Sequence, residues 1–208
     1  MQQAFKVALF DLDGVVLDTE TQYSRFWGAV GRDYHPGVAD FAQRIKGQTL
    51  VEIFGRWFAG DDAAQAAITH RLNSYEAAMD YPYIKGTRAY VEALRRRGVA
   101  TAVVTSSNVP KMDNVRRHHP EMAYLFDHIF TSEDVTASKP APDCYLLGAR
   151  HFGAAPQECV VFEDSVNGLR AGRAAGCYVV GLATTNPRPV VAALADLVVD
   201  DFTSPLLP

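Results

Sequence analysis

A short apolar segment that ends in two aspartates is the feature that most constrains how this chain can fold. Residues 5–10 read Phe-Lys-Val-Ala-Leu-Phe, and Asp11, Leu12, Asp13 and Gly14 follow directly. An apolar run of this length, closed by a turn signal, predicts a buried strand. In an open α/β sheet, ligands bind at the carboxyl ends of the strands, so this strand would deliver two carboxylates to such a site.

The two aspartates are two residues apart, which places them on one face if the strand geometry continues. Carboxylates that close repel each other, and the pKa of one rises unless a cation neutralises the pair. Gly14 allows a backbone turn that a side chain would obstruct. The segment therefore predicts a divalent-cation site, although an acidic loop after a strand is an equally good interpretation of these residues by themselves.

The length and charge of the chain limit the classes of protein to consider. The 208 residues carry a formal net charge of −4, and 48% of them are hydrophobic, which fits one domain or one domain with an insertion. Because there is no basic excess or basic run, nucleic acid is not expected as a partner. No apolar stretch reaches membrane-spanning length, and the first ten residues lack a signal-peptide pattern. We therefore expect a soluble, cytoplasmic protein with no membrane partner, and a monomer by default.

The stretch after the first strand has helical character. Its apolar residues recur at intervals of three and four, as in Tyr23, Phe26 and Trp27, with a helix end expected near Gly31. Because no convincing strand falls in this block, we interpret residues 16–82 as an all-helical cap inserted after the first strand. Caps of this kind close over active sites and exclude water.

Strands alternate with helices in the rest of the chain. The predicted strands are residues 99–104, 128–130, 159–162, 178–181 and 197–199. This alternation predicts an α/β fold with a doubly wound parallel sheet and helices on both faces, a Rossmann-like arrangement. Residues 1–15 and 83–208 would together form one catalytic core around the inserted cap.

Polar residues follow three further strands of this core. They are Thr105, Ser106 and Ser107 after the second strand, Lys139 after the third, and Glu163 and Asp164 after the fourth. The carboxyl ends of parallel strands meet at one edge of the sheet, so these residues would lie near the two aspartates. Carboxylates suit Mg²⁺, and hydroxyls, N–H groups and a lysine suit a phosphoryl group. Each residue alone has an ordinary explanation, such as a helix cap or a surface lysine, and only their joint occurrence predicts the site.

These residues stand in four motifs that resemble those of the haloacid dehalogenase-like phosphohydrolases. The motifs are Phe10-Asp11-Leu12-Asp13-Gly14, Val104-Thr105-Ser106-Ser107, Ser138-Lys139-Pro140-Ala141-Pro142-Asp143 and Val161-Phe162-Glu163-Asp164-Ser165. The resemblance covers essentially the whole chain. The helical insertion also lies where the β-phosphoglucomutase-like branch of that superfamily carries its cap.

The resemblance implies a role for each motif residue. Asp11 would be the nucleophile that forms an aspartyl-phosphate, and Asp13 would be the general acid and base. Mg²⁺ would bind to Asp11, to the backbone carbonyl of Asp13 and to Asp164, with Glu163 acting as a ligand or through a metal-bound water. The residues that would hold the phosphoryl group are Gly14, Thr105, Ser106, Ser107 and Lys139. A carboxylate at position 13 can protonate an alkoxide, which implies cleavage of an oxygen-linked phosphate instead of a carbon–halogen or carbon–phosphorus bond.

Two cap positions bear on the choice between phosphatase and mutase. The mutase carries an arginine just after a Lys-Gly turn and a histidine in its first cap helix, and here Leu50 and Tyr23 stand at those positions. Lys46 lies in the same turn and could contact substrate, or could equally be a solvated loop lysine. We therefore predict a Mg²⁺-dependent phosphatase of a small phosphorylated metabolite, foremost a sugar or polyol phosphate. A β-phosphoglucomutase-type mutase is the alternative, and a pyrophosphatase, a nucleotide phosphatase and a catalytically silent binding module stay open.

Overall fold

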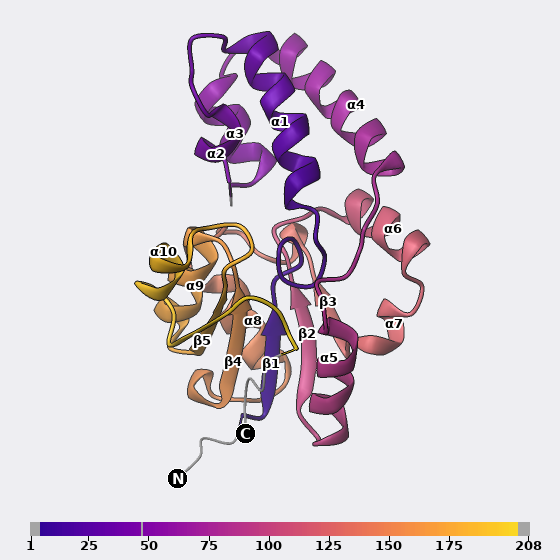
Figure 1. The fold of residues 1–208 in the computed structure, drawn as a ribbon, viewed down its shortest axis with the longest axis vertical. Coiled ribbons are helices and arrows are strands. Elements are labelled where there is room, and N and C mark those ends of the chain that lie inside the picture. The colour runs from indigo at the N-terminus through magenta and orange to yellow at the C-terminus, as the bar shows by residue number, and fades with distance from the viewer. Residues whose placement is uncertain (1–4, 47, 204–208) are drawn as a thin grey trace.

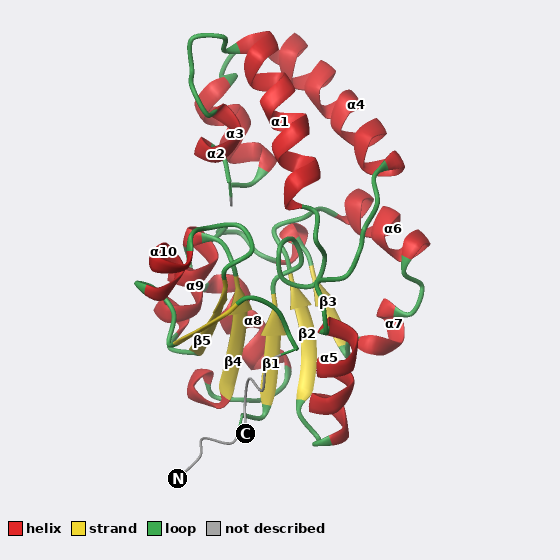
Figure 2. Cartoon of the chain, in the orientation of Figure 1, coloured by secondary structure: helices red, strands yellow, loops and turns green. Residues whose placement is uncertain are grey.

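The computed structural model describes residues 5–46 and 48–203, and a parallel six-stranded sheet forms its centre (Figures 1 and 2). The strand order is β3-β2-β1-β4-β5-β6. The strands are β1 (Val7–Phe10), β2 (Ala100–Val104), β3 (His128–Phe130), β4 (Cys159–Glu163), β5 (Tyr178–Leu182) and β6 (Leu197–Val199). All five pairings are parallel, so the predicted sheet is confirmed.

The first strand is central, and the order of the strands reverses beside it. In the register, Phe10 lies between Val103 of β2 and Phe162 of β4. Later strands are added outward on both sides of β1. In doubly wound folds, a crevice forms at the carboxyl ends of the strands where the order reverses, and ligands bind there. Asp11 follows β1 at that point.

Helices cover both faces of the sheet because the strand residues alternate between two apolar cores. Ala8 and Phe10 belong to one core and Val7 and Leu9 to the other. The helices on the first face are α5 (Thr87–Arg96), α6 (Val109–His118) and α7 (Met122–Leu125), and those on the second are α8 (Asp143–His151), α9 (Val166–Ala175) and α10 (Arg188–Ala192). Two short 3₁₀ helices, Ser132–Asp134 and Pro156–Glu158, complete the core.

Four helices between β1 and α5 form a separate layer over the carboxyl edge of the sheet (Figure 1). They are α1 (Glu20–Tyr34), α2 (Phe41–Arg44), α3 (Leu50–Trp57) and α4 (Asp62–Ala78). This layer has an apolar core of its own, which includes Phe26, Ile53 and Ile68. We propose residues 16–82 as the cap and residues 1–15 and 83–208 as the catalytic core.

The two chain segments that connect the cap to the core run antiparallel and are hydrogen-bonded to each other. The Asp18 amide donates to the Pro82 carbonyl at 2.7 Å, and the Ile84 amide donates to the Val16 carbonyl at 3.0 Å. Leu17 is fully buried beside them. The cap therefore begins and ends at one place, directly after the two aspartates.

The expectation that the first cap helix ends near Gly31 is wrong. Helix α1 continues through this residue to Tyr34. A Cβ at Gly31 would lie 2.6 Å from the Cβ of Phe41, so the glycine allows α2 to approach α1 closely. A glycine that serves interhelical packing gives the same signal in the sequence as one that ends a helix. Among the described helices, none has both the length and the apolar character needed to cross a membrane.

Candidate active site

A buried lysine organises the carboxylates at the ends of β1 and β4. The Lys139 ammonium, 4% exposed, donates to Asp11 Oδ1 at 2.6 Å, to Glu163 Oε1 at 2.6 Å and to the Val104 carbonyl at 3.2 Å. These bonds use all three protons of the ammonium group. Lys139 is therefore fixed between three strand ends, and it holds one oxygen of Asp11 in place.

Glu163 is fully buried, and both of its carboxylate oxygens are already engaged. Its Oε1 accepts from Lys139 and from the Tyr145 hydroxyl at 2.8 Å. Its Oε2 accepts from the amides of Asp164 and Ser165 and from the Ser165 hydroxyl, at 3.0 to 3.1 Å. This side chain thus shapes the turn after β4 and orients Lys139.

Two glycines make room for the acidic side chains. A Cβ at Gly168 would lie 1.7 Å from Glu163 Oε1, and a Cβ at Gly14 would lie 2.1 Å from Asp164 Oδ2. Gly14 also has a φ of +76°, which side-chain-bearing residues rarely adopt. Its role here is to let the carboxylate of Asp164 approach the backbone after β1, so the predicted turn function of Gly14 has a second, steric reason.

The donor set at this edge fits a hard divalent cation. Oxygen atoms of Asp11, Glu163 and Asp164 lie within 4.8 Å of one another. Burial raises the pKa of Asp11 to about 7, against the lowering effect of Lys139. Burial, with Glu163 and Asp11 as negative neighbours, raises the pKa of Asp164 well above its usual range. A cation among these oxygens would remove that penalty, and all-oxygen sites are those that Mg²⁺ prefers.

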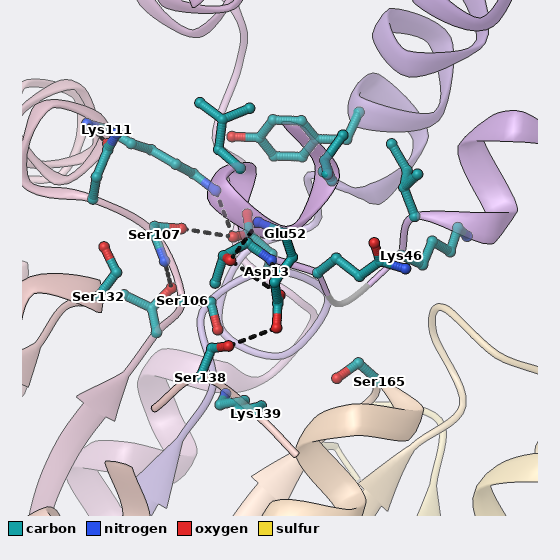
Figure 3. Close-up of a pocket in the computed structure, with 18 of the residues that line it drawn as sticks. Asp13, Lys46, Glu52, Ser106, Ser107, Lys111, Ser132, Ser138, Lys139 and Ser165 are labelled. Carbon is teal, nitrogen blue, oxygen red and sulfur yellow. Dashed lines mark hydrogen bonds and ion pairs between the residues drawn. The ribbon is translucent and has the colours of Figure 1, made fainter. Parts of the chain in front are cut away.

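Asp13 lies on the cavity side of this cluster and is held by three donors. Its Oδ1 accepts from the Thr19 hydroxyl at 2.5 Å. Its Oδ2 accepts from the Ser107 hydroxyl at 3.1 Å and from the Lys111 ammonium at 2.5 Å, as Figure 3 shows. The acid/base candidate is thus tied to the start of the cap and to the end of β2.

The loop after β2 supplies groups for an anion. The Thr105 hydroxyl accepts from the Ser107 amide at 3.0 Å, which rigidifies the turn. Within the described part of the chain, neither the amide nor the hydroxyl of Ser106 has a hydrogen-bond partner. The Thr105 amide, by contrast, donates to the Phe130 carbonyl within the sheet. Among Thr105, Ser106 and Ser107, Ser106 is therefore the residue with the most free donors.

The cap and the core enclose a cavity above these groups. Its volume is about 750 Å³, and both Asp11 and Asp13 line it. The Ser138 hydroxyl, next to Lys139, donates to Glu52 Oε1 of α3 at 2.6 Å, so the cap contacts the core across the cavity (Figure 3). A cavity of this size accommodates a small metabolite and shields it from water.

Comparison with known proteins agrees with this geometry. The family model of haloacid dehalogenase-like hydrolases matches residues 5–176. The chain belongs to this family. It is 35% identical to hexitol phosphatase A of Escherichia coli over 84% of this chain and 81% of that protein. It is 27% identical to β-phosphoglucomutase of Mycobacterium tuberculosis, over 97% and 92% of the two chains. The crystal structure of CbbY from Rhodobacter sphaeroides in complex with phosphate superposes with a TM-score of 0.77 at 25% identity, covering 97% of this chain and 95% of that one.

The structure brings the motif residues of this haloacid dehalogenase-like hydrolase together. The residues from all four motifs that line the cavity are Asp11, Asp13, Thr105, Ser106, Ser107, Ser138, Lys139, Asp164 and Ser165. Glu163 lies directly beneath them, in contact with Lys139. The family and the enzyme class predicted from the sequence are confirmed, whereas the role of each residue stays a prediction.

The cap residues singled out from the sequence also line the cavity. Leu50 is the first residue of α3, and Tyr23 is the fourth residue of α1. Lys46 lines the cavity as well, and its ammonium pairs with Glu20 at 2.5 Å. Because that charge is already neutralised, Lys46 is a weaker candidate for a phosphate contact than its sequence position indicates.

Sequence reasoning missed three residues near Asp13, namely Thr19, Glu76 and Lys111. Lys111 is 5% exposed on α6, and Glu76 is 6% exposed on α4. Glu76 continues the buried stripe of α4 at intervals of four after Ile68 and Leu72. A charged residue in an otherwise apolar stripe of a helix is visible in the sequence, and it could have identified Glu76 as a candidate functional residue.

Proposed function

We propose that this protein is a Mg²⁺-dependent phosphatase that hydrolyses sugar or polyol monophosphates through an aspartyl-phosphate on Asp11. The main support is the pairing of Asp11 with Lys139. Only Oδ1 of Asp11 receives a hydrogen bond from the described residues, so Oδ2 is free to act as a nucleophile. The similarity to a hexitol phosphatase supports the choice of substrate class.

The reaction has two steps on this geometry. In the first, an oxygen of Asp11 attacks phosphorus, and the bond from phosphorus to the ester oxygen breaks. Asp13 gives its proton to the departing alkoxide. In the second, Asp13 takes a proton from water, whose oxygen attacks the same phosphorus. Inorganic phosphate leaves, and the Asp11 carboxylate is regenerated.

The surrounding groups stabilise the charge of the transferring phosphoryl group. We assign the cation to Asp11, Asp164 and the Asp13 carbonyl, where bound Mg²⁺ would supply charge neutralisation. Glu163 is assigned to positioning, because both of its oxygens already accept hydrogen bonds. The free donors of Ser106 would hold a phosphoryl oxygen. All these side chains come from one chain, as a monomer requires.

The mutase alternative has less support from the cap. A mutase must hold a second phosphate while its substrate reorients, which calls for a free cation on the cap side. Leu50 occupies the position where the mutase has an arginine, and Lys46 is paired with Glu20. Water is then the better acceptor for the phosphoryl group.

A phosphate-release screen with Mg²⁺ tests the proposal. The panel contains hexitol and hexose 6-phosphates, glycerol phosphate, β-glucose 1-phosphate, nucleotides and pyrophosphate. We expect release from the hexitol and hexose phosphates, and none from Asp11→Asn. Conversion of β-glucose 1-phosphate to glucose 6-phosphate without release would favour the mutase. No turnover of any compound by folded protein would favour a silent binding module.

A further inference from the structure

Two cap helices present matched pairs of side chains to the cavity. On α1 these are Tyr23 and Trp27, and on α4 they are Leu72 and Glu76. Residues four apart lie on the same face of a helix. Helix α1 begins and α4 ends beside the core (Figure 1), so Tyr23 and Glu76 form a polar pair near Asp13. Trp27 and Leu72 form an apolar pair one turn farther away.

The carboxylate of Glu76 is only half satisfied. Its Oε1 accepts from the Tyr23 hydroxyl at 2.8 Å. The Tyr81 hydroxyl fixes the same residue through its backbone carbonyl at 2.7 Å. Throughout residues 5–46 and 48–203, no hydrogen bond reaches Oε2. Glu76 is 6% exposed as a residue and lines the cavity, so a donor on a molecule bound there could pair with this second oxygen.

Lys111 connects this pair to the reaction centre. Its ammonium lies 4.4 Å from the centre of the Tyr23 ring and 2.5 Å from Asp13 Oδ2. Asp13, Lys111, Tyr23 and Glu76 therefore form a continuous row from the core into the cap. If Asp13 protonates the leaving oxygen, the carbons next to that oxygen lie along this row.

The charges along the row disfavour a second anionic group on the substrate. Lys111 is paired with Asp13, and Lys46 is paired with Glu20. The acidic cap residues that line the cavity are Glu20, Glu52 and Glu76. A neutral chain with hydroxyl groups fits better, because one hydroxyl can donate to a carboxylate and accept from an ammonium group.

We propose that Glu76, oriented by Tyr23, is a specificity-determining residue that selects a neutral, polyhydroxylated leaving group by accepting a hydrogen bond from one of its hydroxyls. This inference rests on the proposed function, since it requires Asp13 beside the ester oxygen. Tyr23 is a positioning residue that acts through Glu76. The apolar pair would contact the carbon skeleton beyond that hydroxyl.

The test compares a hexitol 6-phosphate with phenyl phosphate, whose leaving group has no further hydroxyl. Glu76→Met removes the acceptor, and Glu76→Gln removes its charge at nearly the same volume. We expect kcat/KM for the hexitol phosphate to fall roughly 10- to 100-fold in Glu76→Met, because the loss of a hydrogen bond to a charged group weakens binding by about this factor. The fall should be smaller in Glu76→Gln. Phenyl phosphate turnover should change less than about twofold. Tyr23→Phe should show the same selective loss, about 3- to 10-fold.

Controls keep the outcomes distinct. Glu92→Gln makes the same chemical change on α5, outside the cavity, and should leave both substrates unaffected. Equal losses for both substrates in the Glu76 variants would overturn the proposal, as would unchanged hexitol phosphate turnover. A wild-type preference for bisphosphates or amine-bearing phosphates would also overturn it. If Glu76→Met does not fold, Glu76→Gln and Tyr23→Phe decide the question. Absence of Mg²⁺-dependent release from phenyl phosphate by the wild type would instead contradict the proposed function itself.

Discussion

The core side and the cap side of the cavity differ in how their charged groups are satisfied. On the core side, Lys139 makes three hydrogen bonds and Glu163 accepts five. On the cap side, within residues 5–46 and 48–203, Lys46 has a single ion-pair partner, and Glu76 has one bonded oxygen and one unbonded oxygen. A saturated cluster is rigid and keeps one geometry, whereas an unsaturated one has capacity for a ligand. The cluster of Lys139 and Glu163 therefore suits an invariant chemical step, and Glu76 suits recognition of a leaving group.

Replacement of Asp13 tests the chemical step on the core side, and among the substitutions that keep the Asp11 nucleophile it has the largest expected effect on rate. In Asp13→Asn, the amide cannot give a proton to an alkoxide, so turnover of a polyol phosphate should fall by roughly 10²- to 10⁴-fold. p-Nitrophenyl phosphate has a leaving group that departs without a proton, so its first step should be nearly normal. Rapid-quench kinetics should then show a burst of p-nitrophenol followed by slow turnover, because water still lacks its base. Equal losses on both substrates without a burst would contradict the role of Asp13.

Two lysine substitutions compare the stability of the two sides directly. Lys139→Met leaves Asp11 and Glu163 buried without their cation, and removing one member of a buried ion pair costs about 3–5 kcal/mol. Lys46→Met breaks the more accessible pair with Glu20, which should cost about 1 kcal/mol or less. Urea unfolding of both variants measures the difference in free energy of unfolding. Similar values for the two would show that the core cluster is no more constrained than the cap.

The stabilisation of the protein by Mg²⁺ should depend on residues of the core side and not on residues of the cap side. A ligand that binds only the folded state at 100 times its Kd adds about 2.7 kcal/mol to the free energy of unfolding. We expect Mg²⁺ to raise the Tm of the wild type and of Glu76→Gln, and chelation to reverse the shift. Asp164→Asn should lose most of the shift, since it removes a carboxylate of the proposed site. An unchanged shift in Asp164→Asn would place the cation elsewhere.

The core side could be predicted from the sequence because each of its groups follows a strand directly. Once residues 7–10 and 159–163 are strands of one parallel sheet, Asp11 and Asp164 must meet at its carboxyl edge. Local pattern and topology together therefore suffice. What the sequence does not show is the hydrogen-bond partners of each group, such as the amides in the turn after β4 that donate to Glu163.

The cap side could not be predicted to the same depth, because its contacts join distant parts of the chain. Tyr23 and Glu76 are 53 residues apart, and Asp13 and Lys111 are 98 residues apart. Which residues of α1 and α4 face each other depends on how the helices pack, and helical spacing alone does not define that. The same limitation explains Gly31, where packing against Phe41 was mistaken for a helix end.

The hydrogen bond between Ser138 and Glu52 joins the two sides, and its loss should have the smallest effect on turnover of the changes considered. The Ser138 hydroxyl donates to Glu52 Oε1, while Glu52 Oε2 accepts from the Thr49 amide and hydroxyl at the start of α3. One carboxylate thus both caps a cap helix and connects it to the loop that carries Lys139. Ser138→Ala removes only the connection, a hydrogen bond worth about 1 kcal/mol.

If that bond favours closure of the cap over bound substrate, Ser138→Ala should raise KM by about 3- to 5-fold and leave kcat nearly unchanged, since the chemical groups stay in place. Ser132→Ala is the matched control, because Ser132 also lines the cavity and, among the described residues, its hydroxyl bonds to Glu133 of the core and not to the cap. Thr49→Ala should lower the Tm through the lost helix cap without the same effect on KM. A fall in kcat as large as the rise in KM would show that Ser138 acts on Lys139 and the chemical step, and the separation between a catalytic core side and a recognising cap side would then fail at this residue.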